Sequence, residues 1–139
     1  MAVATASAEI RTPGKVAVVN VTAEVRRALA RSAIRRGLAV VSVPHTTCAV
    51  CVNEDEAGLK KDLERLAAEL LDPLERKERF HHDRIDNNAR AHLTSVLLGH
   101  SATLPVADGD LTLGAWQSLF LLEMDGPRTR RLDMSFLGE

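Results

Sequence analysis

The sequence predicts an α+β fold in which strands at both ends of the chain enclose a central group of helices. Alternating segments open the chain, apolar segments close it, and leucines at helical spacing occupy the middle. A doubly wound sheet would instead alternate strands and helices along its whole length. At 139 residues the chain fits one domain, 1–139, long enough to bury a core.

The first elements are predicted to be a hairpin and a helix. Ala4 to Arg11 and Lys15 to Val21 alternate weakly on either side of Thr12-Pro13-Gly14, which is typical of a turn between antiparallel strands. Thr22 is placed to cap an amphipathic helix, and Gly37 stands where helices commonly stop in a left-handed turn.

A buried strand is predicted next. Leu38 to Val43 is a continuous apolar segment that Pro44 ends, and Thr47 to Val52 follows as its neighbour or its extension. His45 therefore lies at a strand end or bend, where rigid backbone can hold a side chain against a cleft.

The two cysteines are predicted to be small buried hydrophobic residues. Cys48 and Cys51 lie three residues apart on a strand, so their side chains point to opposite faces, and no second pair follows. A metal or redox role is the less favoured interpretation because free cysteine is among the most buried residue types.

Helical spacing begins near residue 55 and stops before Pro73. The leucines that show this spacing are Leu59, Leu63, Leu66 and Leu70. The segment 74–88 is polar and rich in charge and histidine, which predicts a long loop and makes it a candidate for function. Ala89 to Leu98 returns to helical spacing, and Gly99 ends it.

The C-terminal third is predicted to be strands. Ser101 to Ala107, Leu111 to Met124 and Arg131 to Leu137 are separated by turn-forming residues at 108–110 and 125–127. Strands at this end complete the α+β pattern.

The composition excludes two classes of partner. A formal net charge of −1 argues against a generic nucleic-acid binder, because phosphate contacts need a concentrated basic face; local arginine clusters at 26–36 and 128–131 stay open as smaller basic patches. No apolar run reaches the roughly 18 residues that a membrane span needs. Residues 1–8 lack the basic start and apolar centre of a secretory signal, so the expected compartment is the cytoplasm.

Acid/base side chains are concentrated at 82–92, just before and within the third predicted helix, 89–98. Asn88 and His92 are four residues apart and so share one helix face. Asp86 precedes that helix, where it could cap the helix or accept a hydrogen bond from an imidazole. We predict that His45, Asp86 and His92 converge in one pocket.

Two chemical uses fit this combination, and the sequence leaves both open. Imidazole and carboxylate ligands suit a divalent metal such as zinc, and the same pair supplies a general base oriented by a carboxylate. The candidate metal ligands are His45, His82, Asp86 and His92. His81 and His82 are equally explained as exposed loop residues, and His100 as a residue that interacts with the helix end.

Further polar residues could bind a ligand, although each is ordinary by itself. Asn53 and Glu54 close a predicted strand, and Gln117, Arg128 and Glu139 lie in the C-terminal third. Together they offer amides, carboxylates and a guanidinium, and an arginine in a glycine-containing turn is suited to binding phosphate.

Six short blocks, in this order and spacing, resemble the YjbQ-like family over residues 38–139. The blocks are His45-Thr46-Thr47 with Asn53-Glu54, His82-x3-Asp86-x-Asn88-x3-His92, Leu97-Leu98-Gly99-x-Ser101, Gly114-Ala115-Trp116-Gln117, Gly126-Pro127-Arg128 and Gly138-Glu139. Family members often have serine or proline at the position of His100, which here adds an imidazole near the expected cleft.

The resemblance implies a β-sandwich-like α+β domain assembled as a homotrimer through packed sheets. It also implies secondary thiamine-phosphate synthase activity, which joins an aminopyrimidine pyrophosphate to a thiazole phosphate and releases pyrophosphate. A divalent cation, Mg or Zn, would screen the pyrophosphate. The implied catalytic residues are His45, Glu54, Asp86 and His92, and the implied substrate-binding residues are Asn53, Asn88, Gln117, Arg128 and Glu139.

Two other functions are compatible with the same residues. One is a trimeric module that binds a metal or small anion without turnover, and the other is metal-assisted hydrolysis of phosphoesters. In each case the partner is a small molecule, and we expect the pocket to lie at a subunit boundary.

Overall fold

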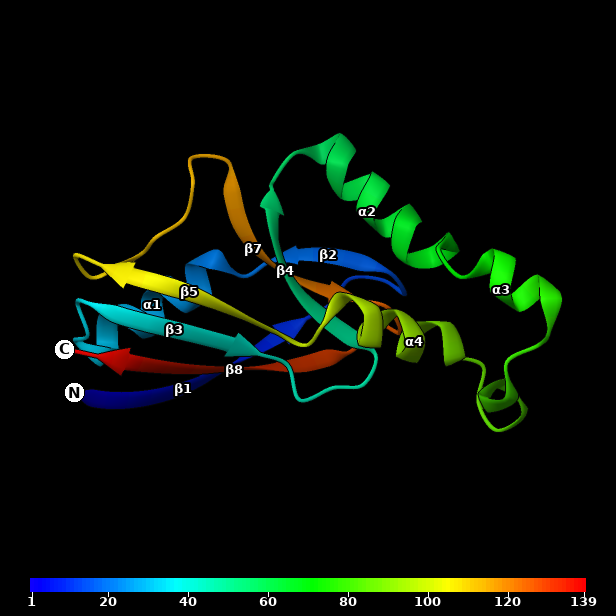
Figure 1. Ribbon diagram of the computed structural model, residues 1–139, viewed down its shortest axis with the longest axis horizontal. Coiled ribbons are helices and arrows are strands. Elements are labelled where there is room, and N and C mark those ends of the chain that lie inside the picture. Colours follow the sequence, from blue (N-terminus) through cyan, green and yellow to red (C-terminus); the bar gives the residue numbers. More distant parts are fainter.

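A computed structural model describes residues 1–139 as two antiparallel sheets with helices around them (Figure 1). The five-stranded sheet has the order β1 (Ala2–Arg11), β8 (Thr129–Gly138), β3 (Gly37–Ser42), β5 (Ser101–Ala107) and β6 (Asp110–Leu111). The three-stranded sheet has the order β2 (Ala17–Asn20), β7 (Gln117–Glu123) and β4 (Cys48–Glu54). The predicted α+β class with a sandwich of sheets is confirmed.

The helical segments lie between strands in the sequence. They are α1 (Thr22–Ser32), α2 (Ala57–Glu69), α3 (Asp72–Lys77), the 3-10 segment η1 (His81–Arg84) and α4 (Ala89–Leu98). None of these helices has the length and apolar character required to cross a membrane.

The main core lies between the two sheets and α1. Val41 and Phe136 face it from the five-stranded sheet, Val50 and Leu121 from the three-stranded sheet, and Leu29 from α1, all almost fully buried. Alternate residues of each strand point into this core, which is the pattern of a sheet with one buried face.

A second, smaller core lies on the opposite face of the three-stranded sheet. Phe120 of β7 and Ala49 of β4 are buried there against Ala67 of α2 and Ala91 of α4. The two helices therefore cover the outside of this sheet, and the small alanines allow close approach. Cys48 belongs to the main core and Cys51 packs against the second one, which confirms their predicted opposite directions.

The predicted N-terminal hairpin is wrong. The strand β1 pairs with β8, whereas β2 pairs with β7 in the other sheet. At the crossing between the sheets, the buried Thr12 donates its backbone N–H to the carbonyl of Arg128 at 2.9 Å. Alternation reveals a half-buried strand but not its partner, so a turn between two strands does not establish that they pair.

Both predicted ends of the first helix are also corrected. Thr22 does not cap α1 with its side chain; its hydroxyl accepts the backbone N–H of Leu119 at 2.9 Å. The helix ends at Ala33, which is left-handed at φ 61°, and Gly37 starts β3 instead. A Cβ at Gly37 would lie 1.9 Å from the carbonyl oxygen of Leu137, so glycine is required there by the close approach of β8.

The remaining elements agree with the sequence prediction in part. Glu56 caps α2 by accepting backbone N–H groups at 2.8 and 2.7 Å, and α4 has the predicted bounds. The predicted loop 74–88 contains part of α3 and all of η1. The predicted strand 111–124 is interrupted by the loop 112–116, in which the N–H of Gly114 donates to the Gln117 side chain at 2.7 Å.

Candidate functional site

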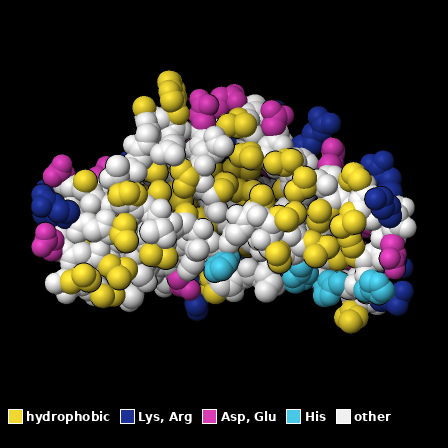
Figure 2. All heavy atoms as spheres, viewed as in Figure 1, with side chains coloured by type: hydrophobic (Ala, Val, Ile, Leu, Met, Phe, Trp, Pro, Cys, Tyr) yellow, Lys and Arg dark blue, Asp and Glu magenta, His cyan; other side chains and the backbone are white.

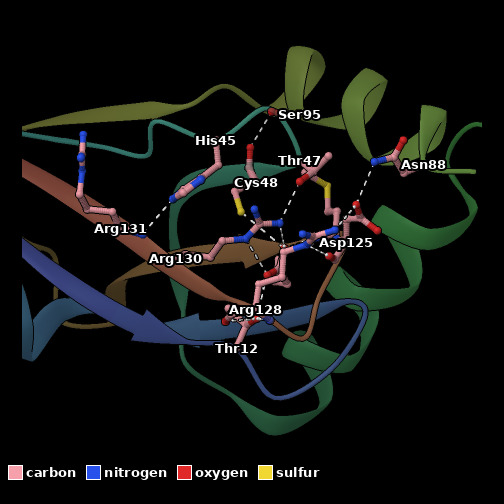
Figure 3. A network of polar contacts seen from close by, with 12 residues as sticks. Thr12, His45, Thr47, Cys48, Asn88, Ser95, Asp125, Arg128, Arg130 and Arg131 are labelled. Carbon is pink, nitrogen blue, oxygen red and sulfur yellow. Dashed lines mark hydrogen bonds and ion pairs between the residues drawn. The ribbon is translucent and has the colours of Figure 1, made fainter. Parts of the chain in front are cut away.

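His45 lies on the connection from β3 to β4 and is held by a backbone donor. Its Nε2 accepts the N–H of Arg131 at 2.8 Å, as Figure 3 shows. Because a backbone N–H can only donate, Nε2 carries no proton, and the neutral ring has its proton on Nδ1. Burial and then the nearby Arg130 guanidinium lower the pKa of His45. The structure therefore favours a neutral imidazole whose Nδ1–H remains available.

A buried ion pair lies behind His45, between the two sheets. Arg130 of β8 donates from Nε and Nη2 to the two carboxylate oxygens of Glu123 of β7, at 2.8 and 2.6 Å. Thr12 donates its hydroxyl to the same carboxylate at 2.7 Å, and the Thr47 hydroxyl accepts from Arg130 at 2.8 Å (Figure 3). Burial alone would raise the pKa of Glu123, but these hydrogen bonds outweigh it and lower the pKa.

This ion pair also fixes the turn after β7. The Glu123 carboxylate accepts the backbone N–H of Asp125 at 3.2 Å. Thr12 accepts the backbone N–H of Arg128 at 2.9 Å. Arg128 in turn donates from Nε to the carbonyl of Asp125 at 2.8 Å. The predicted phosphate-binding arginine is thus positioned by buried groups that the sequence analysis did not select.

A chain of polar contacts joins this turn to the start of α4. Asn88 donates from its amide nitrogen to the Asp125 carboxylate at 2.9 Å (Figure 3), and its amide oxygen lies 3.0 Å from Nε2 of His82. The His82 and His92 rings then meet edge to face, with centroids 4.7 Å apart. Asn88 also lines a separate cavity of about 420 Å³ with Lys15 and Arg90.

All five histidines of the chain line two adjoining surface hollows that share His92. The first hollow, here called the histidine groove, has a volume of about 600 Å³. Its lining residues are Val43, Pro44, His45, Thr46, His92, Ser95, Val96, Gly99 and His100. The second, of about 390 Å³, is lined by Phe80, His81, His82, Ala89, His92 and Leu93. Figure 2 shows histidine side chains along the lower edge of the molecule.

Asp86 does not join His45 and His92. It lines neither hollow, and its carboxylate accepts the N–H of Asn87 at 2.8 Å. Asp83, not Asp86, accepts the first N–H of α4, that of Ala89, at 3.1 Å. Within one chain no three His, Cys, Asp or Glu side chains are grouped closely enough to hold a metal ion. The four predicted ligands therefore do not form a complete metal site in a single chain.

The other predicted residues lie elsewhere. Asn53, Glu54 and Gln117 line a third hollow of about 380 Å³, at the end of β4 that is remote from His45. Glu139 follows β8, where its backbone pairs with that of Arg36 at 3.0 Å. The predicted site residues thus do not form a single site within one chain.

The alternation of side chains along a strand could have shown from the sequence that Glu123 and Arg130 point into the core. Glu123 falls two residues after the buried Leu121, and Arg130 falls two residues before the buried Leu132. A charged residue on the inward face of a strand needs a partner of opposite charge. Two such residues on consecutive strands are the signal that was missed.

The fold places the chain among α+β proteins with two antiparallel sheets, and its own site consists of a buried arginine–glutamate pair and a surface groove lined by histidines. The chain belongs to the YjbQ-like family: residues 6–139 match the family described as UPF0047 protein YjbQ-like.

Similar proteins come from archaea and bacteria. A UPF0047 protein of Methanothermobacter thermautotrophicus is 40% identical over 139 residues, which are 100% of this chain and 95% of that protein. UPF0047 protein YugU of Bacillus subtilis is 34% identical and covers 94% of this chain and 96% of its own length.

Solved structures share the fold over nearly the whole chain. A YbjQ-like protein of unknown function from Sulfolobus solfataricus has a TM-score of 0.92 at 34% identity and covers 99% of both chains. A hypothetical protein from Aeropyrum pernix has a TM-score of 0.91 at 40% identity, covering 98% of this chain and 99% of its own.

Proposed function

We propose that this protein acts on a phosphorylated small molecule as a secondary thiamine-phosphate synthase. The observation that carries the proposal is the lining of the two histidine hollows: five imidazoles and no acidic side chain. Imidazole N–H groups donate to phosphate oxygens, and the absence of carboxylates avoids repulsion of an anion. The family resemblance supplies the particular reaction.

The chemistry of that reaction suits these groups. The thiazole ring nitrogen attacks the methylene carbon attached to the pyrimidine, the carbon–oxygen bond breaks, and pyrophosphate leaves with the electron pair. The attacking nitrogen carries no proton, so the step needs no strong base. It needs donors that stabilise the negative charge on the leaving group. In the proposal His45, through Nδ1–H, and His92 donate to the pyrophosphate.

Arg128 is the proposed second contact to phosphate. Its side chain is 58% exposed, and its guanidinium lies 3.4 Å from the Asp125 carboxylate, a long contact that an anion can replace. Asn88 holds Asp125 from the other side and so keeps the turn in place.

A divalent metal is a separate part of the proposal. Imidazole ligands favour zinc, whereas magnesium prefers oxygen ligands and would arrive with the pyrophosphate. Because one chain does not group three ligands, further ligands would come from the substrate or from a second copy of the chain. No step above depends on the metal, and elemental analysis of the purified protein tests for it.

The proposed assembly is a homotrimer with a site shared between copies. The seven residues of β4 separate its Glu54 end from the end near His45 by about 20 Å, at roughly 3.3 Å per residue. Glu54 and Gln117 can therefore serve the histidine groove only from another copy. The groove is flanked by Val96, 80% exposed, and Leu97, 62% exposed, which are suited to contact with a partner.

Product formation from the two thiamine precursors tests the proposal. We expect turnover by the wild type, a loss of about 100-fold in His92→Ala because a leaving-group donor is removed, and no change in Lys61→Ala on the exposed side of α2. Retained ligand binding without turnover would favour a non-catalytic trimeric module for a metal or small anion. Phosphate release from generic phosphoesters would favour a metal-assisted hydrolase.

A further inference from the structure

Trp116 is the only tryptophan of the chain, and 76% of it is exposed. It lies in the loop between β6 and β7, which in Figure 1 stands beside the end of β4. The hollow of about 380 Å³ at this place, here called the Trp116 hollow, is lined by Val52, Asn53, Glu54, Trp116 and Gln117. A large exposed aromatic ring beside polar side chains can stack on a planar ligand while the polar groups bind its edge.

The polar groups of the Trp116 hollow are available for a ligand. Glu54 and Gln117 lie directly opposite each other on β4 and β7. The Glu54 carboxylate has no hydrogen bond or ion pair, so it is an unused acceptor. The amide oxygen of Gln117 is occupied by the N–H of Gly114 at 2.7 Å, which leaves its amide nitrogen as an unused donor.

Asn53 adds a second donor of the same kind. Its amide oxygen accepts the backbone N–H of Glu54 at 2.8 Å, so its amide nitrogen is unused. The hollow thus offers one carboxylate acceptor, two amide donors and an indole face.

The charge of the Trp116 hollow decides which part of a substrate fits. Its lining contains one carboxylate and no lysine, arginine or histidine, so a phosphate group is not favoured there. A planar ring with both donor and acceptor atoms on its edge matches the indole and the polar groups together, since rings of this kind stack on tryptophan.

We propose that the Trp116 hollow binds a planar amino-substituted heterocycle of the aminopyrimidine class. The ring stacks on Trp116, its amino group donates to Glu54, and a ring nitrogen accepts from the Gln117 amide. The choice of an aminopyrimidine rests on the proposed function. In this assignment the ring of the substrate contacts Trp116 and Glu54, whereas its pyrophosphate contacts His45 and His92.

Tryptophan fluorescence tests the stacking, because the chain has one tryptophan and no tyrosine. The probe is an aminopyrimidine without a pyrophosphate group. We expect saturable quenching of the Trp116 emission by this probe and none by a saturated cyclic amine of similar size. Absence of saturable quenching overturns the proposal. Emission that shifts to shorter wavelength as protein concentration rises, with no response to the probe, also overturns it and assigns Trp116 to a contact between copies.

Paired changes in protein and ligand test the hydrogen bond to Glu54. We expect Glu54→Gln to weaken the aminopyrimidine about tenfold, as does removal of the amino group from the ligand. The two changes together should cost little more than either one, because they remove the same contact. Additive losses would overturn the role of Glu54.

Calorimetry tests Trp116 itself. We expect Trp116→Ala to weaken binding on the order of tenfold, Trp116→Phe to retain most of the affinity, and the exposed control Lys61→Ala to bind as the wild type. Equal affinity in Trp116→Ala overturns the proposal.

Turnover measurements separate this inference from the proposed function. Binding of the aminopyrimidine without product formation leaves the heterocycle site in place and removes the synthase. Product formation with an unchanged KM in Trp116→Ala and Glu54→Gln supports the synthase and overturns the heterocycle site.

Discussion

His45 combines a structural and a chemical role in one ring. Its Nε2 must remain unprotonated to accept the N–H of Arg131, and the same hydrogen bond leaves the proton of the neutral ring on Nδ1, where it is available to a ligand. A histidine on an exposed loop would titrate without structural consequence. Here protonation breaks a contact between the β3–β4 connection and β8, so the charge state of one side chain is coupled to the fold.

The coupling predicts how stability depends on pH. The folded-state pKa of His45 lies below the 6.5 of an unperturbed histidine, so above pH 6.5 its full contribution is present. As pH falls below 6.5, the unfolded chain binds the proton first, and the folded state loses stability. We expect urea unfolding to show a larger loss between pH 7.5 and 5 in the wild type than in His45→Gln. Equal losses would show that His45 does not contribute.

The two cysteines are expected to be unreactive in the folded protein. Burial, followed by the charge of Glu123, raises the pKa of Cys48 to about 12, and burial raises the pKa of Cys51. Because the thiolate is the reactive form, iodoacetamide at pH 7.5 should modify neither residue until urea is added. Mass spectrometry of the native protein provides the measurement, and rapid native labelling of Cys48 would contradict it.

The sequence indicated the histidines of the site but not the charged pair behind them. His45 and His92 stand out by residue type, since few structural roles require an imidazole. Glu123 and Arg130 are common residues whose meaning depends on which face of a strand they occupy. Asp86 was selected by its position before a helix, yet Asp83 is the residue that reaches the helix N–H, because η1 folds this segment back.

The Glu123–Arg130 pair joins two elements that belong to different sheets. Consecutive strands β7 and β8 separate at the turn 124–128, and the pair bridges the space between them at the end near His45. Both side chains are almost fully buried. The pair therefore holds the two sheets of the sandwich in a fixed position relative to each other.

Removal of one partner should be far more costly than removal of both. We expect Glu123→Gln or Arg130→Met alone to lower the free energy of unfolding by about 3–5 kcal/mol, because a buried charge or donor loses its partner. Glu123→Leu combined with Arg130→Met should cost clearly less than the sum of the single changes. Urea unfolding measures all three, and additive losses would show that the two residues act independently.

An element could be predicted from the sequence when the residues that determine it lie close together in the chain. The helices α2 and α4 were predicted because capping and spacing are local: Glu56 caps the one, and Gly99 ends the other. Pairing of β1 with β8 joins residues more than a hundred positions apart, and no local pattern reports it. Gly37 was predicted to end the first helix because glycine is common at that position. It instead begins β3, where the close approach of the Leu137 carbonyl leaves no room for a side chain.

At the scale of the whole molecule, the fold of one chain keeps apart the groups that the proposed reaction needs together. The histidine groove lies at one end of β4 and the Trp116 hollow at the other. The outer face of the five-stranded sheet is free of helices and carries Val3, Leu137, Leu38 and Pro105 in one register row across four strands. Such a face can pack against another copy and bring the two ends together.

Mixed trimers test this arrangement directly. His45→Asn and Glu54→Gln should each lose most activity when prepared alone. When the two variants are co-expressed with different tags and trimers that carry both tags are purified, one of the three shared sites in each trimer receives an intact groove from one copy and an intact Glu54 from the next. Activity of the purified mixed assembly should therefore return to about that fraction of the wild type. The control is a mixture of the two variants purified separately under conditions without subunit exchange, which should stay inactive. A mixed assembly as inactive as its components would mean that each site is built within one chain, and native mass measurement of the same sample would show whether a trimer had formed at all.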